Sequence, residues 1–166
     1  MANKEFSFLM VKPHAIDYAP EIFATLNKKA RQTAGKYIDA VPSEVIRAHY
    51  TPHQDKSFFG PMIQEFVNRP VAIAVYEPFN ERRGVIKELR TILGKTDPRK
   101  ASQKSLRGRM FRERKGGPIE NTLYKHCGFK IIRNFVHASD SPEEARRELL
   151  AWRQYFSDKF IEDLLG

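Results

Sequence analysis

Four stretches of apolar residues predict the strands of this chain. Residues 5–11 begin in alternation and end in an apolar run, which is typical of a strand buried on both faces. Residues 71–76 (Val-Ala-Ile-Ala-Val-Tyr) form the clearest of the four. Two shorter segments, residues 36–41 and 130–136, predict the remaining strands.

Apolar residues three and four positions apart predict helices between and after these strands. The first helix begins at Pro20, and its apolar stripe runs to Ala30, with Gly35 after its end. The strongest helix start is Ser141-Pro142-Glu143-Glu144, a capping box with proline at the first helical position. The other predicted helices cover residues 43–49, 57–66, 80–94 and 156–165.

The order of these elements indicates the fold class. Two βαβ units predict a ferredoxin-like α+β domain (βαββαβ) with a four-stranded antiparallel sheet, to which residues 43–66 add a helical hairpin. Residues 95–129 show no periodicity and predict a long loop. We expect a single domain over residues 1–166, with helices on one face of the sheet and a neighbouring subunit covering the other.

The composition fits a chain that folds without covalent or metal staples. It has 166 residues, of which 41% are hydrophobic, and this length allows a sizeable core. Its single cysteine, Cys127, excludes a disulfide scaffold and a zinc site of the two-CxxC type. No apolar run reaches the ~18 residues of a membrane span, and the N-terminus lacks a signal-peptide pattern. We therefore expect a cytoplasmic protein with no membrane segment.

The net charge of +9 is concentrated in one segment of the chain. Residues 99–133 contain eleven Lys and Arg residues against two acids, an excess that equals the net charge of the whole chain. An anion such as a nucleotide phosphate or a nucleic acid fits such a segment. A solvated loop rich in Lys and Arg is the plainer alternative.

The familiar glycine-rich phosphate loops are missing from the sequence. It contains neither the P-loop pattern nor the dinucleotide-binding glycine pattern. A nucleotide would therefore have its phosphates held by side chains, for which the candidates are Lys12, Arg90, Thr96 and Arg107. Arginine suits this role because its planar guanidinium donates two parallel hydrogen bonds to phosphate oxygens.

A histidine follows the last predicted strand, where the chain gives way to a capped helix. His137 stands in the run from Asn134 to Ser141 (Asn-Phe-Val-His-Ala-Ser-Asp-Ser). Strand ends beside loops are frequent places for functional sites, and histidine is a possible covalent nucleophile. Taken alone, a hydrogen-bonded structural histidine is the more frequent interpretation of such a position.

Five short motifs, in this chain order, resemble those of the nucleoside diphosphate kinase family nearly from end to end. They are Met10-Val11-Lys12-Pro13, His49-Tyr50 followed by Phe58-Phe59, the run from Arg90 to Pro98 (Arg-Thr-Ile-Leu-Gly-Lys-Thr-Asp-Pro), Ser105-Leu106-Arg107-Gly108, and the run from Asn134 to Ser141. Several motifs in the right order are a far more specific signal than any one of them.

The resemblance implies a role for each matched residue. His137 would take the γ-phosphoryl group of a nucleoside triphosphate as a phosphohistidine and pass it to a nucleoside diphosphate in a ping-pong reaction, which maintains nucleotide pools. Glu148 would orient the imidazole of His137, and Tyr50 would lie beside it. The residues implied to hold the phosphates, ribose and base of the nucleotide are Lys12, Arg90, Thr96, Arg107, Asn134 and Phe58.

The resemblance also implies a cofactor and an assembly. Mg²⁺ would arrive with the nucleotide and be held mainly by its phosphates rather than by a protein cage. The family usually forms hexamers or tetramers, so we expect a homo-oligomer.

Three departures from the family pattern stand out. His14-Ala15 follows Lys12-Pro13 where the family usually has Asp-Gly, and the family's next Arg-Gly is absent. Arg107 and Asn134 are 27 positions apart, a much longer spacing than the family usually has, which implies a basic insertion at about 110–130. Strict strand alternation would also place Asn134 and His137 on opposite faces. The alternative function is therefore a catalytically weak kinase-like module that uses the basic insertion to bind nucleotide or nucleic acid.

Overall fold

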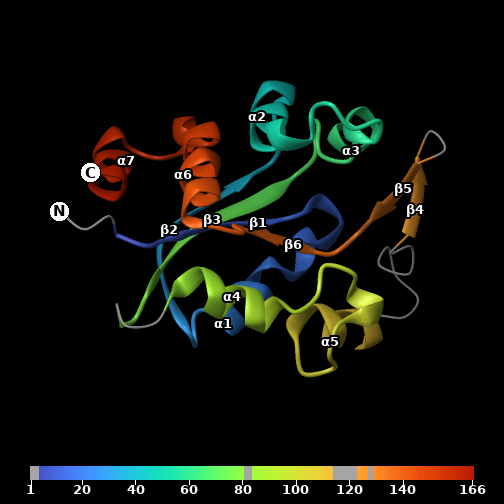
Figure 1. The fold of residues 1–166 in the computed structure, drawn as a ribbon, viewed down its shortest axis with the longest axis horizontal. Helices are drawn as coiled ribbons and strands as arrows, with labels where there is room; N and C mark the ends of the chain where they lie inside the picture. The colour runs from blue at the N-terminus through green and yellow to red at the C-terminus, as the bar shows by residue number, and fades with distance from the viewer. Residues whose placement is uncertain (1–3, 81–83, 114–122, 127–128) are drawn as a thin grey trace.

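A four-stranded antiparallel sheet forms the centre of the molecule in the computed structural model (Figure 1), which describes residues 4–80, 84–113, 123–126 and 129–166. Its strands are β1 (Ser7–Val11), β2 (Ala30–Ile38), β3 (Val71–Pro78) and β6 (Val136–Ala138), hydrogen-bonded in the order β2-β3-β1-β6. This is the strand order of the split βαβ fold. The predicted fold class is confirmed.

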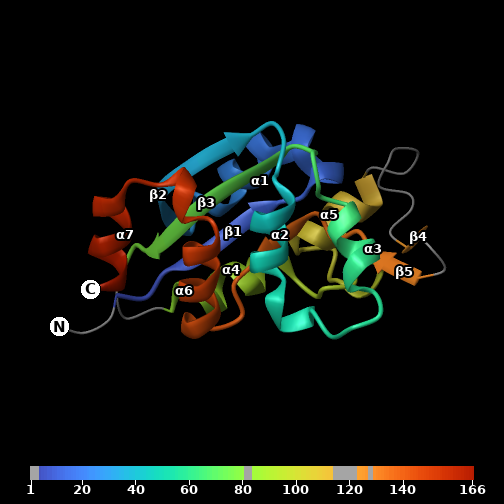
Figure 2. The ribbon, with the colours of Figure 1, turned by 90° about the horizontal axis from the view of Figure 1, so that it is seen from above.

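Helices cover both faces of this sheet (Figures 1 and 2). One side carries α2 (Ser43–His49), α3 (Phe59–Gln64) and α6 (Pro142–Ala151), with α7 (Asp158–Leu165) beyond them. The other side carries α1 (Ala19–Leu26) and α4 (Val85–Leu93). All five residues of β1 are buried, so the expectation that helices lie on one face only is wrong.

The predicted boundary between the first helix and the second strand is also wrong. Helix α1 ends at Leu26, and both Ala30 and Gly35 belong to β2. Strand β2 lies at the edge of the sheet, and only its two end residues are buried. Its polar sequence therefore carries no alternating pattern, and backbone pairing with β3, from Ala30 opposite Pro78 to Ile38 opposite Val71, defines the strand instead.

The stretch predicted as one long loop contains regular structure. Helix α5 (Leu106–Glu113) and a hairpin of β4 (Leu123–His126) and β5 (Phe129–Ile132) lie within it. The buried side of α5 includes Arg107 and Gly108, so no apolar stripe marks the helix in the sequence. The rest of the predicted insertion, including Gly116-Gly117-Pro118, lies outside the described residues.

The last predicted strand divides into two parts. Among the described strands, β5 pairs with β4 alone, in a separate two-stranded sheet, and β6 begins four residues after β5 ends. Four short 3₁₀ helices complete the described elements: Pro13–Tyr18, Thr51–His53, Pro98–Lys100 and Arg153–Tyr155. None of the helices in the described part of the chain is long and apolar enough to cross a membrane.

The capping box predicted at the start of α6 forms as expected. The Ser141 hydroxyl accepts a hydrogen bond from the Glu144 backbone N–H at 3.2 Å, with Pro142 at the first helical position. Helix α6 buries Ala145, Leu149 and Glu148 against the sheet side of the molecule. A carboxylate is thereby placed inside an otherwise apolar helix face.

Candidate active site

A cavity of about 370 Å³ opens where the end of β1, the α2–α3 hairpin and the segment before β6 meet. Residues from distant parts of the chain converge on it because β1 and β6 are neighbours in the sheet. Six of the residues predicted for the site line this cavity: Lys12, Tyr50, Phe58, Thr96, Asn134 and His137.

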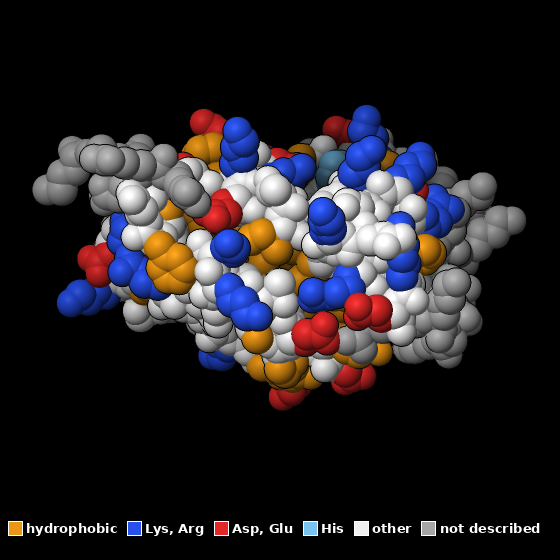
Figure 3. All heavy atoms as spheres, turned by 90° about the horizontal axis from the view of Figure 1, so that it is seen from below, with side chains coloured by type: hydrophobic (Ala, Val, Ile, Leu, Met, Phe, Trp, Pro, Cys, Tyr) orange, Lys and Arg blue, Asp and Glu red, His pale blue; other side chains and the backbone are white. Residues whose placement is uncertain are grey.

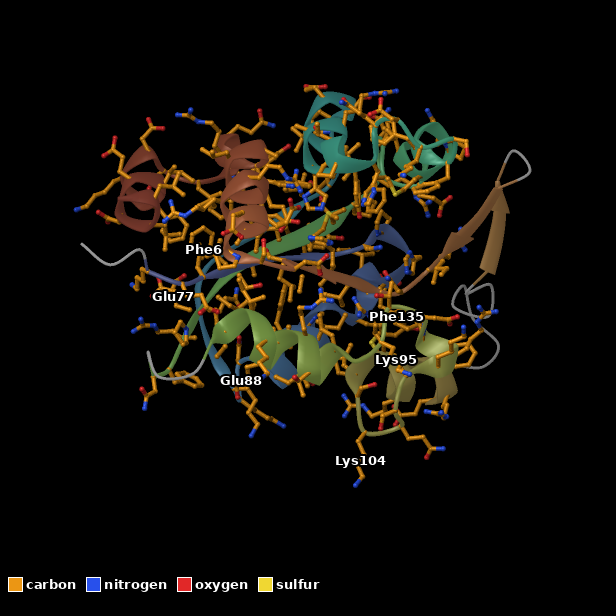
Figure 4. The ribbon with its side chains drawn as sticks, in the orientation of Figure 1. Phe6, Glu77, Glu88, Lys95, Lys104 and Phe135 are labelled. Carbon is orange, nitrogen blue, oxygen red and sulfur yellow. The ribbon has the colours of Figure 1, made fainter. Side chains whose placement is uncertain are left out.

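A γ-turn directly before β6 brings Asn134 and His137 to the same cavity. The Val136 backbone N–H donates to the Asn134 carbonyl at 2.8 Å, and Phe135 between them has φ of +70°. Figure 4 shows Phe135 at the start of β6, beside the turn that follows β1. The strand begins only at Val136, so the alternation that would separate Asn134 from His137 does not apply.

The side chain of His137 is held by Glu148. The distance from His137 Nε2 to Glu148 Oε1 is 2.6 Å, and Ser139 Oγ donates to Glu148 Oε2 at 2.7 Å. Glu148 is buried, whereas His137 keeps access to the cavity. An ionised carboxylate can only accept, so His137 carries its proton on Nε2, and its Nδ1 lone pair is left for a substrate.

The surroundings of His137 keep its imidazole neutral. Burial, together with the charges of Lys12 and Arg107, lowers the pKa of His137 to about 3. Burial also raises the pKa of Glu148 above its usual value, while Ser139 and Arg147 act in the opposite direction. Near pH 7 the imidazole of His137 is therefore neutral, the state that a nitrogen nucleophile needs.

His49 is a neighbour of this pair, and its tautomer argues against a metal site. Ligand atoms of His49, His137 and Glu148 lie within 4.8 Å of one another. However, the Trp152 indole N–H donates to His49 Nδ1 at 3.2 Å, so the proton of neutral His49 is on Nε2. Neither ring nitrogen of His49 then offers a lone pair to a metal. The His49 ring instead packs edge-on against His137, with ring centroids 4.6 Å apart.

Lys12 is a half-buried cation at the wall of the cavity. Its Nζ lies 5.9 Å from the centre of the Phe66 ring. Burial and the charge of Arg107 lower the pKa of Lys12 to about 7, although Glu65 acts in the opposite direction. A bound anion would favour the charged form of Lys12.

Arg90 and Arg107, both predicted to hold phosphate, lie outside the lining of this cavity. The guanidinium of Arg90 is paired with Asp140 at the surface. Arg107 is buried and donates to three backbone carbonyls: Gly94 at 2.8 Å, Asn134 at 3.1 Å and Val136 at 2.6 Å. In this structure Arg107 therefore clamps the γ-turn, and Arg90 is tethered beside the cavity.

Two buried polar atoms at the cavity lack a hydrogen-bond partner among the described residues: Tyr50 Oη and Asn134 Oδ1. Buried polar atoms are nearly always paired, because desolvation without a partner is costly. Both belong to residues that line the cavity. A ligand with hydroxyl and phosphate groups could satisfy both atoms.

Sequence reasoning missed several residues that support the site. Ser139 donates a hydrogen bond to Glu148, and Trp152 donates one to His49. Arg147 donates to the His49 carbonyl at 2.7 Å. His14 also lines the cavity, although it departs from the family pattern. A role for Ser139 could have been predicted from the sequence, since Ser139 belongs to the same motif as His137.

The comparisons with known proteins agree on one family. The model of the nucleoside diphosphate kinase family matches residues 5–158. The nucleoside diphosphate kinase of Staphylococcus haemolyticus is 32% identical over 150 residues, which cover 89% of this chain and 87% of that protein. That of Bacillus cereus is 32% identical over 147 residues, covering 87% and 85%.

Solved structures show the same fold. The nucleoside diphosphate kinase of Encephalitozoon cuniculi superposes with a TM-score of 0.69 at 23% identity, over 95% of this chain and 99% of that chain. The enzyme from Aquifex aeolicus gives a TM-score of 0.69 at 25% identity, over 93% and 96%. With the family model and the curated relatives covering most of its length, this chain belongs to the nucleoside diphosphate kinase family.

Proposed function

We propose that the protein transfers the γ-phosphoryl group of a nucleoside triphosphate, typically ATP, to a nucleoside diphosphate through a phosphohistidine on His137, and so maintains nucleotide pools. The observation that carries the proposal is the arrangement of His137. Its Nε2 is held by buried Glu148, and its ring lines the cavity with Nδ1 left for a substrate. Phosphoryl transfer depends mostly on positioning and charge neutralisation. The hold of Glu148 on His137 supports the first requirement, and the charges of Lys12 and Arg107 near His137 support the second.

The proposed reaction has two displacements. In the first, the Nδ1 lone pair of His137 forms a bond to the γ-phosphorus while the bond to the bridging oxygen breaks, and its electron pair leaves with the nucleoside diphosphate. The imidazole ring becomes positively charged because Nε2 keeps its proton, and the carboxylate of Glu148 at 2.6 Å balances this charge. In the second, an oxygen of the acceptor diphosphate attacks the phosphorus, and the electron pair returns to Nδ1.

In this proposal, different residues of the cavity contact the base, the ribose and the phosphates of the nucleotide. Phe58, partly exposed at 37%, would stack on the base, and the unpaired Asn134 Oδ1 would accept from a ribose hydroxyl. Lys12, Thr96 and Tyr50 would contact phosphate oxygens. Arg90 would join them by leaving Asp140, and Arg107 would act on the phosphates from behind the γ-turn while it keeps the turn in place.

The residues present suit a Mg²⁺ ion that enters with the nucleotide. Among the described residues that line the cavity, Glu65 is the single carboxylate, and it is paired with Arg133 at 3.2 Å. The cavity therefore offers no cage of oxygen ligands, and Mg²⁺ would be bound by the nucleotide phosphates. When bound, the ion neutralises charge on the transferred phosphoryl group.

Labelling with γ-labelled ATP tests the proposal directly. After incubation with Mg²⁺, we expect a protein label that survives alkali, is lost in acid and passes to added dGDP. Phosphoserine and acyl phosphate behave differently under these treatments. A chain that binds ATP yet stays unlabelled would contradict the phosphohistidine mechanism and favour a nucleotide-binding module.

The lowered pKa of Lys12 gives a pH prediction. A pKa near 7 means that Lys12 is cationic below pH 7 and neutral above it, so the free enzyme loses a phosphate-binding charge as the pH rises. We expect kcat/KM to fall about tenfold per pH unit above this value. The bound polyphosphate raises the pKa, so kcat at saturation stays level to higher pH.

The Lys12→Arg variant is the control for that pH profile. Arginine stays charged throughout this range, so the alkaline decline of kcat/KM should move upwards by more than one pH unit, whatever the absolute activity of the variant. A decline that stays in place would assign it to another group.

Several expectations from the sequence remain proposals. We propose a homo-oligomer, hexamer or tetramer, because Tyr37 on the edge strand β2 is 55% exposed beside the half-buried ring of Phe23 and a shallow cavity. Sedimentation velocity tests this proposal.

Figure 3 shows Lys and Arg side chains spread over the face formed by α1, α4 and α5. Most side chains of the basic insertion lie outside the described residues, so nucleic-acid binding by this segment stays a prediction. The cytoplasmic location of the protein also stays a prediction.

A further inference from the structure

His14, which stands where the family usually has aspartate, contacts the γ-turn that precedes β6. The Phe135 backbone N–H donates to His14 Nε2 at 3.1 Å. The rings of His14 and Phe135 also lie together, with centroids 5.9 Å apart and planes inclined by 56°. One side chain thus holds both the backbone and the side chain of the residue at the centre of the turn.

Phe135 needs such a hold because its backbone is strained. A φ of +70° lies in the left-handed region, which is unfavourable for a residue with a bulky side chain. Strain of this kind persists only where the surroundings fix it, and it gathers at functional sites. The other contacts of the turn are the Lys12 N–H to the Phe135 carbonyl at 2.9 Å and the Arg107 guanidinium to the carbonyls of Asn134 and Val136.

His14 can accept the Phe135 N–H only while its ring is neutral. Burial lowers the pKa of His14 well below its usual value, and the nearby charges of Lys12, Arg133 and Arg69 act in the same direction. An imidazolium would offer no lone pair to the turn. An aspartate at this position would instead bring a negative charge among these cations.

We propose that His14 is a positioning residue for phosphoryl transfer: it fixes the γ-turn at Phe135 and thereby the directions in which Asn134 and His137 enter the cavity. The route is short, since His137 is two residues beyond Phe135 and its strand β6 starts at the turn. This inference rests on the proposed function of His137 and explains one of the departures of this chain from its family.

Two variants separate positioning from stability. His14→Phe keeps a ring against Phe135 but removes the acceptor, while His14→Gln places an amide oxygen near the position of Nε2. At saturating ATP and Mg²⁺, we expect the rate constant for phosphohistidine formation in His14→Phe to fall about 100-fold, as for small misplacements of reacting groups. The KM for ATP should change much less, and His14→Gln should recover most of the rate.

The amount of label at completion, measured alongside the rate, counts the folded sites, so a variant that folds poorly is still interpretable. If His14→Phe has a lower melting temperature but a wild-type rate constant per labelled site, His14 is only structural and the proposal is overturned. Equal losses in His14→Phe and His14→Gln would also overturn it, since the acceptor would then not matter.

Amide hydrogen exchange provides a readout that does not depend on catalysis. We expect the Phe135 amide to be protected in the wild-type chain, to exchange faster in His14→Phe and to regain protection in His14→Gln. A wild-type chain that is never labelled but shows this exchange pattern would overturn the proposed function while retaining the hold of His14 on the turn. Unchanged protection in His14→Phe would overturn the inference about His14.

Discussion

The His137→Ala variant is expected to lose phosphoryl transfer, with kcat/KM lower by about 10⁶-fold, the scale of removing a covalent nucleophile. The expectation follows from the geometry around Glu148. His137 is the cavity-lining residue that combines a ring nitrogen held by a buried carboxylate with a second nitrogen left for the substrate. No protein label should form with γ-labelled ATP, whereas ATP should still bind, because Lys12, Phe58 and Thr96 remain in the cavity wall.

A second histidine in the same cavity provides the matched control. The ring of His53 lies 6.0 Å from that of Phe58 and 6.3 Å from that of Tyr50, as part of the cavity wall. His53→Ala should therefore still take up the acid-labile label, even if its affinity for nucleotide changes. Labelling of His137→Ala, or loss of the label in His53→Ala alone, would assign the nucleophile to another residue.

The sequence predicted those elements whose burial leaves a periodic pattern. Strands β1 and β3 are buried over nearly their whole length, and their apolar runs predicted them. Strand β2 was misplaced because its exposed edge position needs no apolar alternation. Helix α5 was missed because its buried side holds Arg107, a charged residue that tertiary hydrogen bonds to backbone carbonyls compensate.

The site shows the same division between local pattern and contacts through space. Motif resemblance placed Lys12, Asn134 and His137 in one site, and all three line the cavity. The turn at Phe135 that allows this could not be predicted, because a left-handed phenylalanine contradicts its own backbone preference. Two of the contacts that stabilise it, from His14 and from the Lys12 backbone N–H, join residues more than 100 positions apart, and no local sequence pattern reveals them.

Glu148→Gln is expected to lower the rate of phosphohistidine formation by roughly 10²- to 10⁴-fold. The substitution keeps the shape of the side chain and removes its charge. Ser139 can turn its hydroxyl to the Phe8 carbonyl at 3.2 Å, so the buried amide need not disturb the fold. The imidazolium that forms on phosphorylation then has no counter-charge, and an amide turned the other way would favour the wrong tautomer of His137.

The same substitution on an exposed residue of α6 separates this effect from a general change in the helix. Glu143 lies in the first turn of that helix and is exposed. The Glu143→Gln variant should therefore keep the wild-type rate. A wild-type rate in Glu148→Gln, with the label still on His137, would show that the carboxylate does not assist the transfer.

The pH dependence of the rate tests whether the ionised carboxylate of Glu148 is the group that assists the transfer. Burial raises the pKa of Glu148, so the carboxylate is protonated at a higher pH than an ordinary glutamate. The ionised form is the active one, and the wild-type rate should therefore decline as the pH falls through this raised pKa. His137, whose pKa is lowered to about 3, is still neutral there and cannot cause the decline. In Glu148→Gln the slower rate should stay level over this range, because the group that titrates has been removed. An acid decline that persists unchanged in the variant would contradict the role of Glu148 and leave the loss of rate without an electrostatic cause.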